Sequence, residues 1–280
     1  MTLTAVHTQS PTRTPTRRRY LVCPPRFFTV RYSINPWMHP EVPTDGERAL
    51  RQWQVLVATY RRLGHVVEEI EPHPDLPDMV FAANAAVIFG GRVYGARFRF
   101  PQRVPEAALY RERLRELGFT DVTEPHFVNE GEGDFLVVGS RFVLAGYGMR
   151  TDPRAHAEAE AVLGLPVISL ELVDPRYYHL DTALAVLDET TIAYYPPAFS
   201  SAGRRILAEL FPDALVVDDA DAAVLGLNAV SDGYHVVLPV QAHHFAAQLA
   251  DRGFQPVPVD VSEFRKAGGG PKCATLELRV

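Results

Sequence analysis

The sequence predicts an α/β fold. Strand-like and helix-like segments alternate from about residue 20 to the C-terminus, and the order strand–strand–helix–strand recurs several times. The content of 47% hydrophobic and 22% charged residues is that of an ordinary globular protein. No residue motif repeats with the elements. The pattern therefore fits either a mixed α/β sheet or a ring of similar α/β units.

The individual elements follow from local patterns. Residues 46–63 carry apolar side chains at helical spacing, and Gly64 ends this predicted helix. Further helices are expected at residues 106–117, 153–163, 201–210 and 245–252. Short apolar runs bounded by turn residues predict strands at 20–23, 65–70, 79–89, 92–96, 135–138, 142–145, 183–187, 191–195, 215–217, 229–231, 235–239 and 255–259.

Residues 19–280 are expected to form one domain, because no clear linker interrupts the pattern. Residues 1–18 are rich in Thr, Pro and Arg, and we expect them to be a disordered basic leader. They lack the apolar centre of a signal peptide. No apolar run approaches the ~18 residues that a membrane span needs.

Charge and cysteine content indicate which partners and which cellular compartment are expected. The net charge is −6, with 34 acidic and 28 basic side chains, which argues against nucleic acid or an anionic membrane as a partner. Two cysteines do not make a disulfide framework, so a cytoplasmic location is expected. The oligomeric state stays open, a homo-oligomer included.

Cys273 is a candidate nucleophile. It follows three glycines, which can take backbone angles closed to other residues, and its neighbour Lys272 favours a thiolate. For an isolated cysteine, a structural role beside a turn is the simpler interpretation. The other cysteine, Cys23, lies at a strand end and is expected to be structural. Neither CxxC nor HExxH is present, so no metal site is expected.

Three more segments carry polar groups that suit catalysis or binding. Residues 130–134 place carboxylates between glycines just before a strand. His179 and Asp181 enter a predicted hairpin and would share one face of a strand, as an acid/base unit requires. Asp78 and Asn84 flank an apolar run, where a buried amide needs a partner. Each segment also has an ordinary structural explanation when it is taken alone.

Together these motifs resemble the guanidino-group-modifying enzyme superfamily. That group includes arginine deiminases, dimethylarginine dimethylaminohydrolases, amidinotransferases and arginine dihydrolases. The motifs, in the superfamily's order, are PDMVFAAN, YGARFRF, EGEGDFL, YGMRTD, YHLDTAL and GGGPKCATLEL. The resemblance implies a pentein fold, a five-fold α/β propeller of ββαβ units. It also implies a hydrolase that forms a covalent thiouronium on cysteine, acts on a small molecule, and needs no metal or organic cofactor.

The resemblance also implies roles for single residues. Cys273 would be the nucleophile, His179 the acid/base, and Glu130 the carboxylate that binds the guanidinium and orients His179. Glu132 is the alternative to Glu130, because glutamates flank Gly131, which stands where relatives have their glutamate. The implied substrate-binding residues are Asp181, Asn84, Asn35, Asp78, Phe81, Arg97 and Arg150. Among these, Asp78 would meet the α-amino group and the two arginines the α-carboxylate.

Two positions indicate the branch of the superfamily. Ala83-Asn84 stands where dimethylaminohydrolases usually carry Glu-Asp, and Asp181 where they carry lysine. Arginine deiminases share HLDT but have aspartate at the Asn84 position and a helical insertion. Asn35 together with Asn84 resembles arginine dihydrolase, which converts arginine to ornithine, carbon dioxide and ammonia. A dimethylaminohydrolase or a deiminase, either giving citrulline, is the alternative; an amidinotransferase or a non-catalytic arginine-binding protein is less favoured.

Overall fold

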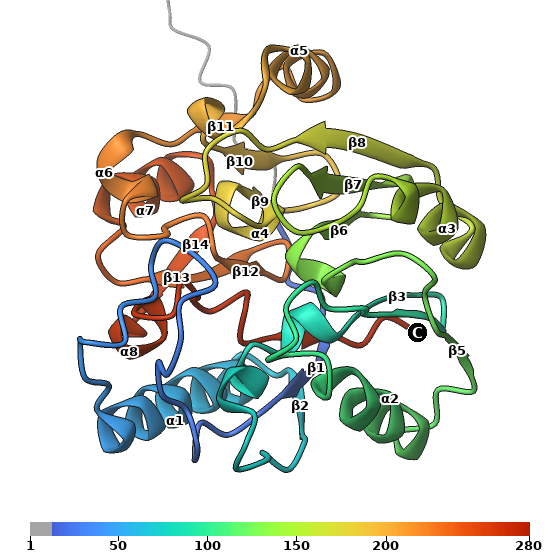
Figure 1. Ribbon diagram of the computed structural model, residues 1–280. Helices are drawn as coiled ribbons and strands as arrows, with labels where there is room; N and C mark the ends of the chain where they lie inside the picture. The colour runs from blue at the N-terminus through green and yellow to red at the C-terminus, as the bar shows by residue number, and fades with distance from the viewer. Residues whose placement is uncertain (1–12) are drawn as a thin grey trace, which may run out of the picture.

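The computed structural model describes residues 13–280 (Figure 1). The first twelve residues of the predicted leader lie outside this range, and residues 13–18 lie against the domain. The amide of Thr16 donates to the carbonyl of Asp232 at 2.8 Å, and Arg13 pairs with Asp188.

The helices are α1 Gly46–Arg62, α2 Glu106–Glu116, α3 Arg154–Leu163, α4 Leu180–Ala183, α5 Ser201–Leu210, α6 Asp219–Ala222, α7 His243–Asp251 and α8 Ser262–Arg265. The five longer helices agree closely with the predicted ranges, and the four-residue helices α4, α6 and α8 were not predicted. The strands are β1 Arg19–Val22, β2 Val66–Glu69, β3 Ala86–Phe89, β4 Arg92–Gly95, β5 Asp121–Thr123, β6 Phe135–Val138, β7 Phe142–Tyr147, β8 Val167–Glu171, β9 Leu184–Val186, β10 Ile192–Tyr194, β11 Leu215–Val216, β12 Val230–Ser231, β13 His235–Pro239, β14 Gln255–Val259 and β15 Leu276–Glu277.

Within residues 13–280 the strands form five three-stranded sheets of one design. The middle strand pairs antiparallel with one neighbour and parallel with the other, as β4 does with β3 and β5. A parallel pair needs a crossover connection, and α2 supplies it here. Figure 1 shows the longer helices on the outside of the molecule. The recurring strand–strand–helix–strand order is thus a set of separate small sheets in a mixed α/β fold.

One sheet joins the two ends of the described chain. Strand β1 pairs parallel with β2 and antiparallel with β15, with Tyr20 opposite Glu277. In Figure 1 the C-terminal segment runs from α8 through the middle of the molecule to reach this sheet. The short loop before β15 carries Cys273, so this pairing holds the cysteine near the centre.

The first helix shows why these segments fold as predicted. Asp45 caps α1 by accepting a hydrogen bond from the amide of Arg48 at 2.9 Å. Leu56 and Tyr60 on its inner face are fully buried and pack with Tyr20 of β1 in one apolar cluster. A strongly amphipathic helix beside a strand buries its apolar stripe in this way.

Two predictions of local structure were wrong in part, and only residues 86–89 of the predicted strand 79–89 are strand. Residues 79–85 form two 3₁₀ turns, Pro77–Val80 and Ala82–Ala85, before β3 begins. The backbone carbonyls there meet side chains instead of a sheet: Tyr110 donates to the carbonyl of Met79 at 2.5 Å. Residues 180–183, expected to enter a hairpin, form the short helix α4. The edge strands β5 and β8 were not predicted.

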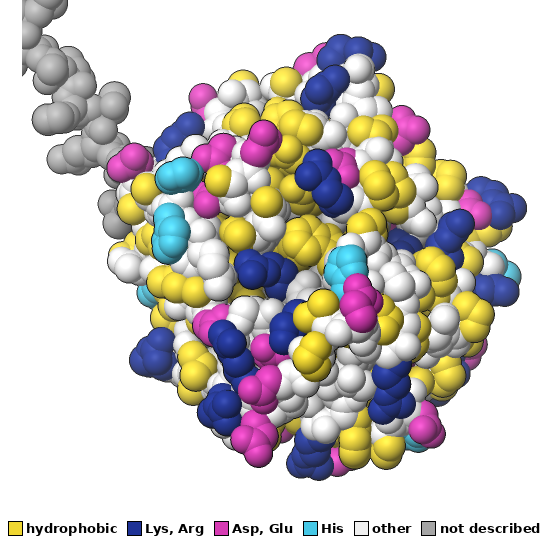
Figure 2. Space-filling model, turned by 60° about the vertical axis from the view of Figure 1, so that its left-hand side comes forward, with side chains coloured by type: hydrophobic (Ala, Val, Ile, Leu, Met, Phe, Trp, Pro, Cys, Tyr) yellow, Lys and Arg dark blue, Asp and Glu magenta, His cyan; other side chains and the backbone are white. Residues whose placement is uncertain are grey.

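Charged side chains of both signs are mixed on the surface that Figure 2 presents, where Lys and Arg are interspersed with Asp and Glu. In the part of the chain that the structure describes, no helix is both long and apolar enough to cross a membrane.

Candidate active site

Four of the predicted catalytic and binding side chains meet at one buried place. Cys273 lies in the loop before β15, Glu130 directly precedes a 3₁₀ turn, His179 precedes α4, and Asp181 lies within α4. Their exposed fractions are 2%, 0%, 1% and 0%, respectively. Segments that are far apart in the sequence therefore supply a thiol, an imidazole and two carboxylates to a common interior site.

The Cys273 thiol is held between an acid and an amide. Its Sγ lies 3.2 Å from Oδ2 of Asp181 and 3.0 Å from Nδ2 of Asn228. Asn228 also accepts the amide of Cys273 at 2.9 Å. Burial, together with Asp181, raises the pKa of the thiol well above its ordinary value, and burial raises the pKa of Asp181 to about 7. The resting cysteine is therefore a thiol that donates to Asp181.

Lys272 does not act on the thiol as the sequence suggested. Its Nζ donates to Oε2 of Glu132 at 2.5 Å and to the carbonyl of Thr275 at 3.2 Å. The ammonium group of Lys272 is thus paired with Glu132. The pKa of Cys273 is raised, not lowered. The expectation of a Lys272-stabilised thiolate was wrong for this resting state.

The contacts of Lys272 also distinguish the roles of the two glutamates that flank Gly131 in the EGEGD motif. Glu132 accepts from Lys272, from Arg279 and from the amide of Glu277, the last at 3.0 Å. Although burial alone would raise its pKa, Arg279 and Lys272 lower it. Glu132 is therefore a structural anion beneath the C-terminal strand, while Glu130 faces His179.

Glu130 is bound on both sides. Its Oε2 lies 2.7 Å from Nε2 of His179 and 2.6 Å from Nη1 of Arg150, and its Oε1 accepts the amide of Arg99 at 3.2 Å. Burial would raise its pKa, but Arg150 and His179 hold it well below the ordinary value. An ionised Glu130 is what an orienting carboxylate for His179 requires.

Arg150 is buried in this site. Its guanidinium lies over the ring of Tyr178, 4.6 Å from the centroid, and Nη2 donates to the carbonyl of Ile34 at 2.9 Å. The sequence assigned Arg150 to the substrate carboxylate; in the structure it pairs with Glu130, and its contact with substrate stays a prediction.

The glycine loop packs tightly. A Cβ on Gly268 would lie 2.9 Å from the hydroxyl of Tyr178, and one on Gly269 would overlap the ring of Phe81. Of the three glycines only Gly268 has a positive φ, +83°. Glycine is thus required mainly for close approach and less for unusual backbone angles. Phe81, predicted to bind substrate, supports this loop by packing against it.

Asp78 and Asn84 are buried beside the site. Oδ1 of Asn84 accepts from Nη1 of Arg103 at 2.6 Å, and Oδ2 of Asp78 accepts from the hydroxyl of Tyr32 at 2.7 Å. Several buried polar atoms here have no hydrogen-bond partner within residues 13–280. They are Oδ1 of Asp78, Nδ2 of Asn84, Nδ1 of His179 and Oδ1 of Asp181. Buried polar atoms are normally satisfied, so this cluster is built for a polar ligand.

Two predicted binding residues do not enter this cluster. Arg97 is exposed and donates to the carbonyl of His126 at 2.8 Å. Asn35 donates to the carbonyl of Ala267 at 3.0 Å and accepts the amide of Trp37 at 2.9 Å. The amide nitrogen of Asn35 therefore binds the residue before the glycine loop, while its oxygen binds the backbone of its own loop.

Sequence reasoning missed Asn228 and Arg103. Asn228 stands in an otherwise apolar stretch, the same signal that singled out Asn84, and it follows the strained residue Leu225, whose φ is 57°. Arg103 had no comparable signal, because a lone arginine before a helix is ordinarily solvated.

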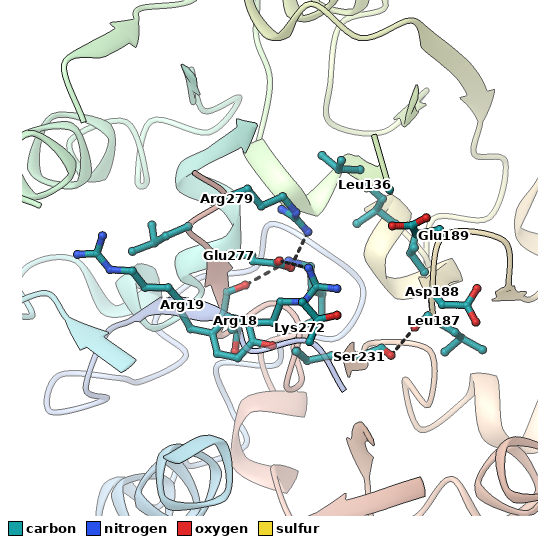
Figure 3. Close-up of a pocket in the computed structure, with 18 of the residues that line it drawn as sticks. Arg18, Arg19, Leu136, Leu187, Asp188, Glu189, Ser231, Lys272, Glu277 and Arg279 are labelled. Carbon is teal, nitrogen blue, oxygen red and sulfur yellow. Dashed lines mark hydrogen bonds and ion pairs between the residues drawn. The ribbon is translucent and has the colours of Figure 1, made fainter. Parts of the chain in front are cut away.

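A separate cavity of about 510 Å³ is lined in part by Lys272 (Figure 3). In Figure 3 Arg18 and Arg279 point toward Glu277, while Glu189 lies on the opposite wall. Arg18 and Arg279 pair with Glu277 at 3.3 and 2.7 Å. The residues that line this cavity do not include Cys273, so it is distinct from the candidate site.

One cluster in residues 13–280 has donors close enough for a metal: Asp218, Asp221 and His244. Asp218 accepts the amide of Asp221 at 2.9 Å and contacts Nδ1 of His244 at 2.7 Å. Asp221 accepts the amide of Phe245. These carboxylates cap α6 and α7, which accounts for their positions.

Comparisons with known proteins agree with the predicted family. A scan against protein-family models gives no match. The chain is 61% identical over 266 residues to the N(G),N(G)-dimethylarginine dimethylaminohydrolase of Mycobacterium tuberculosis, with 95% of this chain and 87% of that protein covered. It is 35% identical over 265 residues to the bifunctional arginine dihydrolase/ornithine cyclodeaminase ArgZ of Synechocystis sp., covering 93% of this chain and 37% of that longer protein.

Solved structures give the same picture. The N-terminal domain of ArgZ, in a cysteine-to-serine mutant bound to substrate, has a TM-score of 0.89 and 34% identity, with 94% of this chain and 98% of that chain covered. A variant of the same domain covalently bound to a reaction intermediate also has a TM-score of 0.89, at 35% identity, with 93% of this chain and 97% of that chain covered. The chain therefore belongs to the guanidino-modifying enzyme family of dimethylarginine dimethylaminohydrolase and arginine dihydrolase, which confirms the prediction from its motifs.

Proposed function

We propose that this protein is a hydrolase that acts on the guanidino carbon of arginine or a close derivative. The observation that carries the proposal is the group of unpartnered buried polar atoms beside the Cys273 thiol in the described part of the chain. A guanidinium offers N–H donors on two edges, and carboxylates match them with bidentate hydrogen bonds. Asp181 has one oxygen available for such a substrate, and Glu130 is held ionised.

The proposed reaction begins with activation of the thiol. In the resting state burial and Asp181 raise the pKa of Cys273 and keep it protonated. A substrate cation that binds Asp181 weakens this effect and favours the thiolate. The thiol proton passes to His179 as Sγ attacks the guanidino carbon, and His179 delivers that proton to the leaving nitrogen, so that ammonia departs and leaves a thiouronium on Cys273. His179 next removes a proton from the water that hydrolyses this intermediate to citrulline.

We propose arginine dihydrolase as the overall activity. In a second round Sγ attacks the ureido carbon of citrulline and displaces another ammonia. Water then hydrolyses the thiocarbamate to a carbamate, which loses carbon dioxide and leaves ornithine. The neutral side chain of Asn84 supports this second round, because the ureido group carries no charge for a carboxylate to bind. The relative ArgZ, named as an arginine dihydrolase, supports the same activity.

Dimethylarginine dimethylaminohydrolase is the second candidate. A specific observation favours it: the relative from Mycobacterium tuberculosis that bears this name is 61% identical over most of both chains. In that case dimethylamine would be the leaving group and citrulline the final product. The chemistry at Cys273, His179 and Glu130 would be unchanged.

Product analysis separates the candidates. The enzyme is incubated with arginine and, separately, with asymmetric dimethylarginine. Ornithine from arginine supports the dihydrolase, citrulline alone supports a deiminase, and dimethylamine supports the dimethylaminohydrolase. Adding glycine as acceptor tests for an amidinotransferase, and binding of arginine without turnover would indicate a non-catalytic protein.

The nucleophile is tested separately. Cys273→Ser should abolish turnover while the protein stays folded, and Cys23→Ser should leave turnover intact. Mass spectrometry of the quenched wild type should find the adduct on Cys273. An active Cys273→Ser enzyme would refute the mechanism.

We also propose that the five small sheets are the ββαβ units of a five-fold α/β propeller, with residues 19–280 as one domain. Their common strand order and the pairing of β1 with β15 support this arrangement. A small-molecule substrate and a cytoplasmic location fit the same proposal.

A further inference from the structure

We propose that the cavity of about 510 Å³ is a second binding site, which takes a small organic carboxylate with an apolar tail. The cavity is separate from the candidate active site, because its lining includes Lys272 and Thr275 but not Cys273. Its volume is in the range of known small-molecule sites. The inference goes beyond the proposed function and does not depend on it.

The cavity lies where the five sheets meet. Each sheet contributes its edge strand to the lining, through Phe89 of β3, Leu136 of β6, Val186 of β9, Ser231 of β12 and Glu277 of β15. The edge of a sheet carries backbone N–H and C=O groups without a strand partner, and such groups can bind the polar end of a ligand. Apolar side chains such as Leu136, Val186 and Leu187 cover much of the wall, which favours a ligand with an apolar tail.

The charged part of the cavity holds one cation more than it holds carboxylates. Lys272 and Arg279 both bind Glu132, and Arg18 and Arg279 both pair with Glu277. In Figure 3 the side chains of Arg18, Lys272 and Arg279 lie together around Glu277. The other charged side chains of the lining balance one another: they are Arg19 paired with Glu68, Asp188 paired with Arg13, and the exposed Arg17 and Glu189. One negative charge on a ligand would therefore complete this cluster.

Buried polar atoms beside the cluster lack a partner. Nε of Arg18 and the hydroxyl of Tyr20 have no hydrogen-bond partner in residues 13–280, and both residues line the cavity. Burial raises the pKa of Tyr20 strongly and Glu277 raises it further, which indicates that the hydroxyl lies close to the cluster. Lys272 has three N–H donors, of which two bind Glu132 and the carbonyl of Thr275. Buried polar atoms are normally satisfied, so these donors indicate a place for an acceptor.

Lys272 links the cavity to the nucleophile. It lines the cavity and directly precedes Cys273, whose Sγ donates to Asp181 at 3.2 Å. Burial raises the pKa of Asp181, whereas the charge of Lys272 lowers it. A carboxylate bound at Lys272 would offset this charge. Such a ligand should therefore hold Cys273 as a thiol and slow its reactions.

Binding is tested by isothermal titration of the protein with hexanoate at constant ionic strength. Acetate lacks the tail and hexanol lacks the charge, so each should bind at least ~10-fold more weakly. Arg18→Gln should weaken hexanoate binding about tenfold, the size expected for hydrogen bonds to a charged group. Val186→Glu, which places a carboxylate in a half-buried part of the wall, should abolish it. Arg26→Gln and Val55→Glu, at exposed positions outside the cavity, are the matched controls.

The link to the nucleophile is measured as the rate at which iodoacetamide alkylates Cys273 near neutral pH, followed by mass spectrometry. Saturating hexanoate should slow this rate severalfold in the wild type and leave it unchanged in Val186→Glu. If hexanoate binds no tighter than acetate or hexanol, or binds equally to the wild type and both cavity variants, the proposed site is wrong. Slowing that persists in Val186→Glu also overturns the site, and binding without slowing overturns the link to Cys273. Neither measurement uses a guanidino substrate, so failure here is distinct from failure of the proposed function.

Discussion

Replacing Asp181 by asparagine should change how stability depends on pH. Burial raises the pKa of Asp181 to about 7 in the folded protein. In the unfolded chain an aspartate has a pKa of about 3.9. The folded state therefore binds more protons than the unfolded state between these values. The contribution of Asp181 to stability is fully present below about pH 4 and is lost as the pH rises toward 7.

The size of the effect follows from this difference. At about 1.36 kcal/mol per pKa unit, a difference of about 3 corresponds to ~4 kcal/mol, of which ~3 kcal/mol falls between about pH 5 and pH 8. An asparagine side chain cannot titrate, so Asp181→Asn should gain ~3 kcal/mol over the wild type between these pH values. Burial also raises the pKa of Asp134 to about 6 and that of Glu106 to about 7. Both are present in both proteins, so their contributions cancel in the difference.

The assay is urea unfolding of both proteins at about pH 5 and pH 8, with the free energy extrapolated linearly to water. Asp213→Asn, a change at an exposed carboxylate, is the control. Its stability should depend on pH in the same way as that of the wild type. If the wild type and Asp181→Asn differ by the same amount at both pH values, Asp181 is ionised in the folded protein. Burial would then not raise the pKa of Asp181 in the folded protein, and the reasoning above would be refuted.

Three more substitutions test the site. Gly133→Ala should lower kcat/KM at least ~100-fold and lower stability by about 1–3 kcal/mol, because its Cβ would overlap the buried Asn84 amide; steady-state kinetics with urea unfolding checks this. Asn228→Ala should lower kcat and alter the pH at which iodoacetamide alkylates Cys273, since the thiol loses a donor at 3.0 Å; an unchanged alkylation profile would contradict this. Glu132→Gln should destabilise the protein by about 3–5 kcal/mol in urea unfolding, because buried cations lose their carboxylate. Near-wild-type stability would show that Glu132 is dispensable there.

Local sequence signals were enough to predict the order of the elements and the chemical groups of the site. Helix α1 was predictable because its apolar spacing and the following Gly64 are local signals, and the structure ends it one residue earlier than expected. The motifs around Glu130, His179 and Cys273 identified the family, since their residue types and order are visible without coordinates.

Which groups face one another depends on the tertiary structure. Glu130 and Glu132 are two residues apart and chemically identical, yet one meets His179 and the other meets Lys272. The turn at Gly131, with φ +51°, sends them in opposite directions. Arg103 illustrates the same limit, because its contact with Asn84 depends on packing between segments that share no local pattern. Local sequence sets conformations a few residues at a time, whereas the pairing of buried charges is settled by the whole fold.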